Sequence, residues 1–214
     1  MMGIVANRLF LSSCMALALV SPVLHAGFEE AVNYFDAGQY DLALKEIQPL
    51  AEKGDARCQY SMGVLYENGF GVEKNPPLAA TWYLKSAEQG NSDAQYNLGA
   101  MHEHGTGIPV NYIEAARWYR PAAEAGDVDA LSNLGVLYEK GQGVAQDKVL
   151  AMALYNVSVA VAQNSNTQAA RNRQGLANRM PLDDVKKALA LTETLLKPNN
   201  LKPGLEAYLT EHPQ

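Results

Sequence analysis

The side chains best suited to chemistry stand together at His102, Glu103 and His104, because imidazole and carboxylate groups can bind zinc. Residues two apart on a helix point about 200° away from each other, so the two histidines cannot share one ion. His102 also occupies the place that Tyr66 and Tyr138 occupy 36 residues away on either side. We therefore interpret it as a packing position and expect no metal site.

The glutamates suggest a second chemistry, acid–base catalysis by paired carboxylates. Glu67, Glu103 and Glu139 recur at intervals of 36 residues, which indicates a structural position present once per repeat rather than one active site. The sequence contains no phosphate-binding loop, nucleophile elbow, zinc-protease motif or Ser-x-x-Lys combination. We therefore expect no enzyme activity, no catalytic residue and no cofactor.

These residues belong to a stretch that the chain repeats with a period of 36 residues. A fixed period over so many positions indicates a repeat array rather than a compact domain of mixed topology. The recurring residues include Gly54, Gly90 and Gly126; Gly63, Gly99 and Gly135; and Tyr83, Tyr119 and Tyr155.

Glycines and capping residues divide each repeat into two helices. In the central repeat, Gly90 supplies a left-handed residue that closes one helix, and Asn91 can cap the next. That helix runs for about 13 residues and stops at Gly105 and Gly107, and a further helix begins after Asn111. The sequence thus predicts two antiparallel helices, A and B, in each repeat.

The spacing within the repeats carries a family resemblance. The patterns Gly-x-x-x-Ala-x-x-x-Leu-Gly, Tyr-Glu-x-Gly-x-Gly-Val, Ala-x-x-Trp-Tyr and Ala-Glu-x-Gly resemble the Sel1-like repeat, a relative of the tetratricopeptide repeat. The resemblance covers residues 55–163 in three copies. It implies an all-α fold, a right-handed α-solenoid whose A helices line a concave face that holds other proteins.

The remaining segments extend this array, and we expect one domain. The last segment contains Pro198, Pro203 and Pro213 and is expected to be mobile, with docking against the last repeat as the alternative. The predicted segments are a tetratricopeptide-like unit at 27–54, repeats at 55–90, 91–126 and 127–163, a capping helix pair at 164–196 and a tail at 197–214.

Residues 1–26 have the pattern of a cleaved secretory signal peptide. Arg8 precedes an apolar run at 9–20 that is too short to span a membrane, and Ala26 suits the cleavage point. Cys14 suggests a lipoprotein, but the apolar run continues six residues beyond it, so a lipid anchor is not favoured. We expect a bacterial periplasmic protein, with secretion as the alternative.

Composition narrows the class of partner. The chain has 17 Lys and Arg against 23 Asp and Glu, a net charge of −6, and no basic run, which argues against nucleic acid. Loss of the signal peptide would leave Cys58 as the only cysteine. Because Cys58 stands where Ala94 and Ala130 stand, we expect a buried, inert thiol.

Side chains that point away from helix B and differ between repeats can encode a specific partner. Tyrosines and amides among mixed charges suit an extended peptide or a helix. The alternative is that this face is only solvated. Helical spacing places on this face Arg57, Tyr60, Ser61, Val64, Asn68, Asp93, Tyr96, Asn97, Ala100, His104, Asp129, Ser132, Asn133, Val136 and Lys140.

The sequence therefore predicts a non-catalytic scaffold in the bacterial cell envelope that binds a partner protein or peptide, with regulation of a signalling or envelope assembly as one use. A secreted factor that meets a host or competitor protein is the first alternative. A protein that binds or hydrolyses peptidoglycan or β-lactams is the second, on the family resemblance alone.

Overall fold

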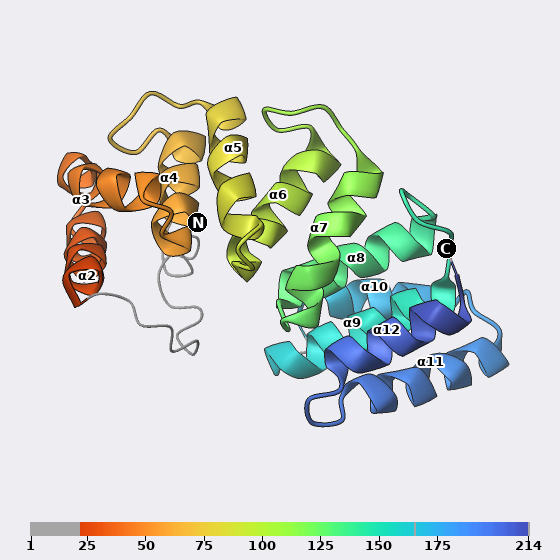
Figure 1. Cartoon of the computed structure of the whole chain (residues 1–214). Coiled ribbons are helices and arrows are strands. Elements are labelled where there is room, and N and C mark those ends of the chain that lie inside the picture. The colour runs from red at the N-terminus through yellow and green to blue at the C-terminus, as the bar shows by residue number, and fades with distance from the viewer. Residues whose placement is uncertain (1–21, 165, 214) are drawn as a thin grey trace. The chain divides into compact units, whose positions relative to one another are not determined.

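The chain is all-helical over residues 22–164 and 166–213, the part described by the computed structural model (Figure 1). No helix in this part is long and apolar enough to cross a membrane. The helices are α2 (Pro22–Asp36), α3 (Tyr40–Glu52), α4 (Ala56–Asn68), α5 (Pro76–Ala87), α6 (Ser92–His104), α7 (Tyr112–Glu124), α8 (Val128–Lys140), α9 (Lys148–Ala162), α10 (Gln168–Ala177), α11 (Leu182–Leu195) and α12 (Leu201–Glu211).

The helices follow one another as antiparallel pairs, which confirms the predicted fold class. Residues 27–54 fall on α2 and α3, the three predicted repeats on α4 to α9, and residues 164–196 on α10 and α11. The predicted apolar run at 9–20 and Cys14 lie outside the described residues. Helix α2 begins at Pro22, so the expected cleavage point falls within this helix.

The described chain divides into two compact units. The first contains residues 22–94 and 106–108, and the second contains 95–105 and 109–213. The repeat pattern of the sequence predicted one domain. A repeat contacts only its neighbours, so an array has no core shared by all its helices and can divide along its length. The division falls within the second repeat, between Ala94 and Gln95 near the start of α6.

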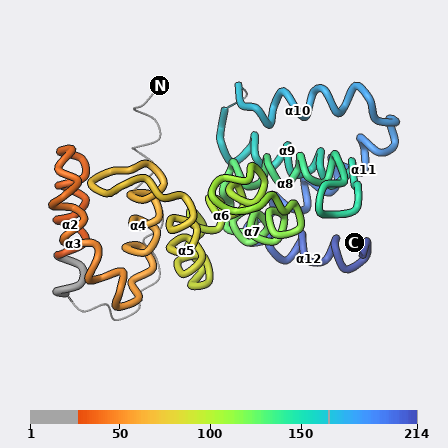
Figure 2. Tube along the Cα trace, turned by 90° about the horizontal axis from the view of Figure 1, so that it is seen from above, coloured from red at the N-terminus to blue at the C-terminus, as the bar shows by residue number. Residues whose placement is uncertain are grey.

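Each unit has its own layered packing. In the first, α3 packs on α2, α4 on α3 and α5 on α4. In the second, α8 packs on α7, α9 on α8, and both α10 and α11 on α9. Helix α12 contacts α11 and α7, and Figure 2 shows it on the opposite side of α9 from α10.

The predicted helix ends are confirmed by their hydrogen bonds. Gly90 has a φ of 87°, and its amide donates to the Ala87 carbonyl at 3.0 Å. The Asn91 amide donates to the Ser86 carbonyl at 3.3 Å, which completes a Schellman closure. The Asn91 side chain then accepts from the Ala94 amide at 2.9 Å and begins α6.

Helices A and B approach closely because a glycine on A faces a tyrosine ring on B. A Cβ atom added to Gly99 would lie 2.7 Å from Cδ1 of Tyr119, which is fully buried. No side chain fits there without displacing the ring. The same relation joins Gly63 to Tyr83, at 2.5 Å, and Gly135 to Tyr155, at 2.7 Å.

The C-terminal segment differs from the expected mobile tail, because α12 is docked on the second unit. Leu205 is fully buried, and the Tyr208 hydroxyl donates to Asp147 Oδ2 at 2.8 Å. Lys202 Nζ lies 3.5 Å from Glu124 Oε2. Leu205 and Tyr208 stand three apart on one face of α12, so a single helix can bury both, and this offsets the entropy of ordering the segment.

We predict that Gly99→Ala lowers the free energy of unfolding by about 2 kcal/mol through overpacking against Tyr119. The matched control is Gly175→Ala in α10, where the nearest atom to the new Cβ is Arg179 Nη2 at 4.0 Å. The control removes a helix-interior glycine without a clash, so it leaves stability unchanged or raises it by up to about 1 kcal/mol. Urea unfolding followed by circular dichroism measures both, and equal stability of the two variants would contradict the assignment.

Candidate protein-interaction surface

The predicted partner face is largely closed in the first unit. Tyr60, Ser61 and Val64 are buried there, with exposed fractions of 8%, 4% and 4%. Arg57 donates to Asp55 Oδ2 at 3.1 Å. Asp93 is half-buried, and Asn68 alone of this set is exposed.

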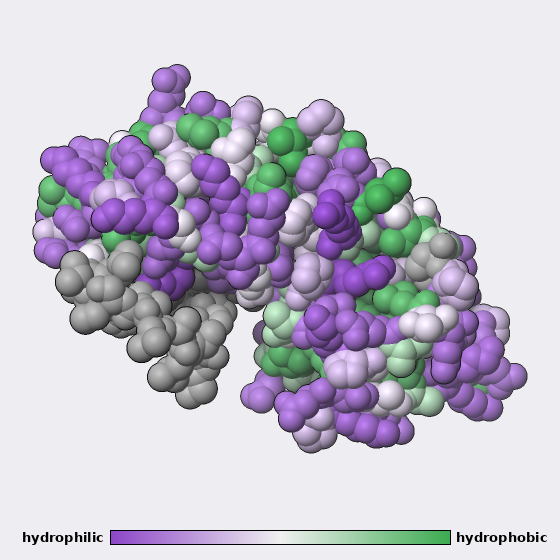
Figure 3. Space-filling view, viewed as in Figure 1, coloured by the Kyte–Doolittle hydropathy of each residue, from purple (hydrophilic) through white to green (hydrophobic). Residues whose placement is uncertain are grey.

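The second unit leaves more of this face open. His104 at the end of α6 and Lys140 at the end of α8 are exposed, whereas Ser132 is buried. The side of the molecule drawn in Figure 3, in which no single residue is marked, is mostly polar, with apolar side chains in small groups. The half-buried members of the predicted face in this unit are Tyr96, Asn97, Ala100, Asp129, Asn133 and Val136.

A hydrogen-bonded network lies beneath this face. The Tyr119 hydroxyl donates to Glu103 Oε2 at 2.7 Å and accepts from Asn133 Nδ2 at 3.1 Å. Burial, and then the Glu103 carboxylate, raise the pKa of Tyr119, so the hydroxyl stays protonated and remains a donor. Asn133 therefore ties α8 to α7 in addition to lying on the predicted face, a role that sequence reasoning missed.

The same tyrosine–glutamate bond occurs in each repeat. Tyr83 donates to Glu67 at 2.7 Å, and Tyr155 donates to Glu139 at 2.8 Å. The second oxygen of Glu139 accepts from Arg179 at 2.8 Å. The prediction that these glutamates are structural positions is thus confirmed.

His102 lies on α6, half-buried, with an unusual polar environment. Its Nδ1 atom is buried and has no hydrogen-bond partner. Burial lowers the pKa of the imidazole, although Glu114 and a hydrogen bond with the Pro109 backbone act in the opposite direction. Within residues 22–164 and 166–213, no group of three His, Cys, Asp or Glu side chains is placed to hold a metal ion.

Cys58 occupies the small inner position of α4. It is fully buried, as are Ala94 and Ala130 at the matching positions. Burial raises the pKa of the thiol, and the charge of Asp55 adds to this effect. The thiol is therefore protonated at neutral pH and packs as a small apolar group, as expected.

Antiparallel helix pairs joined by this Gly–Tyr–Glu contact define a helical repeat scaffold. The Sel1 repeat family model matches residues 56–91, 92–127 and 128–157. A crystal structure of a Sel1 repeat protein from Oxalobacter formigenes is 30% identical, with a TM-score of 0.65, over 78% of this chain and 70% of that chain. The chain belongs to the Sel1 repeat family, whose members typically act as scaffolds for protein interactions.

A second solved structure is similar over more of this chain. It is c5321, described as a protective antigen present in uropathogenic Escherichia coli strains displaying an SLR fold. The two share 25% identity with a TM-score of 0.73 over 88% of this chain, which spans 40% of that one. No curated protein matches the chain.

We predict that His102→Tyr reduces the loss of stability at acidic pH. Because the pKa of His102 is lower in the folded state, the unfolded chain binds more protons once the pH falls below about 6.5, and the free energy of unfolding then decreases. Tyrosine does not titrate there, and Tyr138 fills the same place in the next repeat. Urea unfolding above and below this pH measures the difference.

The control for that prediction is His104→Gln, because His104 is exposed two residues away. Equal effects of the two substitutions would show that burial of the imidazole is not the cause. An unchanged pH dependence in His102→Tyr would contradict the role assigned to the buried imidazole.

Proposed function

We propose that this protein is a non-catalytic scaffold that binds another polypeptide on the A-helix face of its second unit. The observation that carries the proposal is the contrast between the two units at matching positions. Ser61 and Val64 are buried in α4, whereas Asn97 and Ala100 are half-buried in α6. Side chains of the second unit are thus available to a partner.

The composition of this face suits a polypeptide partner. The Asn97 amide can both donate to and accept from a peptide backbone. The small Ala100 and the branched Val136 leave shallow apolar surface between the polar groups. Lys140 at one end favours a partner segment with a negative charge.

The proposed compartment is the bacterial periplasm, on the basis of the signal-peptide pattern at residues 1–26. A use in signalling or envelope assembly follows from that location. The second candidate is a secreted factor that meets a host protein. It is favoured by the similarity to c5321, which is described as a protective antigen.

Site-specific photocrosslinking in the native cell envelope tests the proposal. A photoreactive amino acid replaces Asn97, Ala100 or Val136, one position at a time, in the full chain. We predict one crosslinked partner shared by the three positions, because helical spacing predicts that they lie on one face.

The matched controls carry the same photoreactive group at Leu189 or Glu193, which are exposed on α11. These should give no such product. Equal crosslinking from α11, or none from the A-helix face, would contradict the proposed surface. A product found only in the culture medium would favour the secreted factor.

A further inference from the structure

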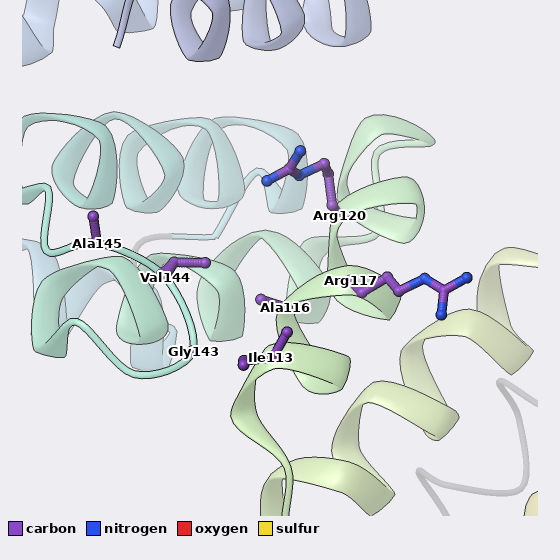
Figure 4. A pocket seen from close by; sticks show the side chains of 7 residues that line it. All are labelled: Ile113, Ala116, Arg117, Arg120, Gly143, Val144 and Ala145. Carbon is purple, nitrogen blue, oxygen red and sulfur yellow. The ribbon is translucent and has the colours of Figure 1, made fainter. Parts of the chain in front are cut away.

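A cavity of about 680 Å³ lies in the second unit between α7 and the turn that precedes α9 (Figure 4). Its size is within the range of ligand-binding pockets in proteins. Ile113 and Ala116 on α7 face Val144 and Ala145 on the turn, and these four side chains make an apolar floor. Ile113 is 66% exposed, so its side chain is accessible to a ligand.

The turn is held against α7 by a glycine. Gly143 has a φ of 71°, and a Cβ atom there would overlap the Tyr112 backbone at the start of α7. The turn can therefore lie directly against the start of α7, because residue 143 has no side chain.

Arg120 brings a positive charge into this apolar cavity. Its side chain extends over the space between α7 and the turn, whereas Arg117 points away and pairs with Glu114 at 3.2 Å. Arg120 is half-buried, and its Nη2 lies 3.4 Å from the Tyr138 hydroxyl, a long bond to a neutral group. Glu124 Oε2 lies 3.5 Å from Lys202 Nζ, and the charge of Arg120 also acts on this carboxylate without forming an ion pair with it.

Among the residues that the structure describes, the Arg120 guanidinium therefore forms no ion pair within 4 Å, and Glu124 acts on it only from a longer distance. A half-buried cation beside apolar side chains is costly unless a negative charge pairs with it. A carboxylate in the cavity would supply that charge with two hydrogen bonds.

The combination is specific to the second repeat. At the positions that match Arg120, the first and third repeats have Leu84 and Asn156. At the positions that match Ile113, they have Pro77 and Val149. Arg120 and Asn156 each bond to a later helix, through Tyr138 and Thr192. Only the second repeat adds to this an arginine charge beside an exposed isoleucine, a combination that the repeat architecture does not require.

Helix geometry gives the spacing that a ligand must match. Ile113 and Arg120 are seven residues apart, which is roughly 10 Å along the axis of α7. An extended peptide advances about 3.3 Å per residue, so it covers this distance in about three residues.

We propose that this cavity binds an acidic segment of a partner protein in which an aliphatic side chain is followed, three residues later, by Asp or Glu. The aliphatic group lies on Ile113, Ala116 and Val144, and the carboxylate pairs with Arg120. This site lies on a B helix and a turn, so it is distinct from the A-helix face of the proposed function.

Fluorescence anisotropy with a labelled synthetic peptide tests the site in the full chain. The probe is an eight-residue Ser/Gly peptide that carries Leu and, three residues later, Glu. We expect saturable binding that weakens about tenfold or more when the peptide Glu becomes Gln, when its Leu becomes Ser, or in Arg120→Gln. The Gln peptide should bind wild type and Arg120→Gln equally, since the ion pair is already lost.

Arg171→Gln on α10 is the matched control, because Arg171 is exposed and bonds only within its own helix to Gln168. It should bind the probe as the wild type does, and so should Asn97→Ala on the A-helix face. No saturable binding up to about 1 mM peptide, or equal binding by Arg120→Gln, would overturn the proposal. Loss of binding in Asn97→Ala would assign the peptide to the A-helix face instead.

Discussion

The structure depends on one contact that is made three times, a tyrosine ring of helix B lying on a glycine of helix A. At Gly99 the ring of Tyr119 occupies the space that any Cβ would fill. The hydroxyl of the same tyrosine then reaches Glu103 one turn further along helix A. Steric fit therefore sets the distance between helices A and B, and the hydrogen bond sets their alignment along the helix axis.

This contact explains why the recurring glutamates, which the sequence offers for acid–base catalysis, are not catalytic candidates. Glu103 is the acceptor of a buried hydroxyl, and the raised pKa of Tyr119 keeps that hydroxyl a donor. The same arrangement at Glu67 and Glu139 uses these carboxylates for architecture. Positions outside the contact need not carry the same residue in every repeat. Both proposed binding surfaces consist of such positions.

The sequence predicted the parts of the fold that have a local cause. Glycines with positive φ and capping residues such as Asn91 act within a few residues of themselves, so their spacing revealed the helix ends. The period of 36 residues then revealed that the helices form pairs, A and B, in each repeat. The hydrogen bond from Asn133 to Tyr119 joins one repeat to the next, and neither residue type indicates such a bond in the sequence.

Two further features could not be decided from the sequence for the same reason, although docking of the C-terminal segment was one of two alternatives. The docking of α12 depends on Asp147, the residue that caps the start of α9, 61 residues away from Tyr208. The cavity beside Arg120 depends on the turn of the following repeat, which residue spacing alone does not place over α7. For the partner face, residue spacing identified one side of each A helix. The burial of that side depends on what packs against the helix. Val64 in the first unit is therefore buried, whereas Val136 in the second is half-buried.

The most direct test of the central claim is a double-mutant cycle between Tyr119→Phe and Glu103→Gln, measured by urea unfolding. If the tyrosine–glutamate bond holds helix B on helix A, the two changes are coupled by about 1.5 kcal/mol or more, as for a hydrogen bond to a charged group. Effects on the free energy of unfolding that add to within about 0.3 kcal/mol would contradict the claim, because the two side chains would then act independently.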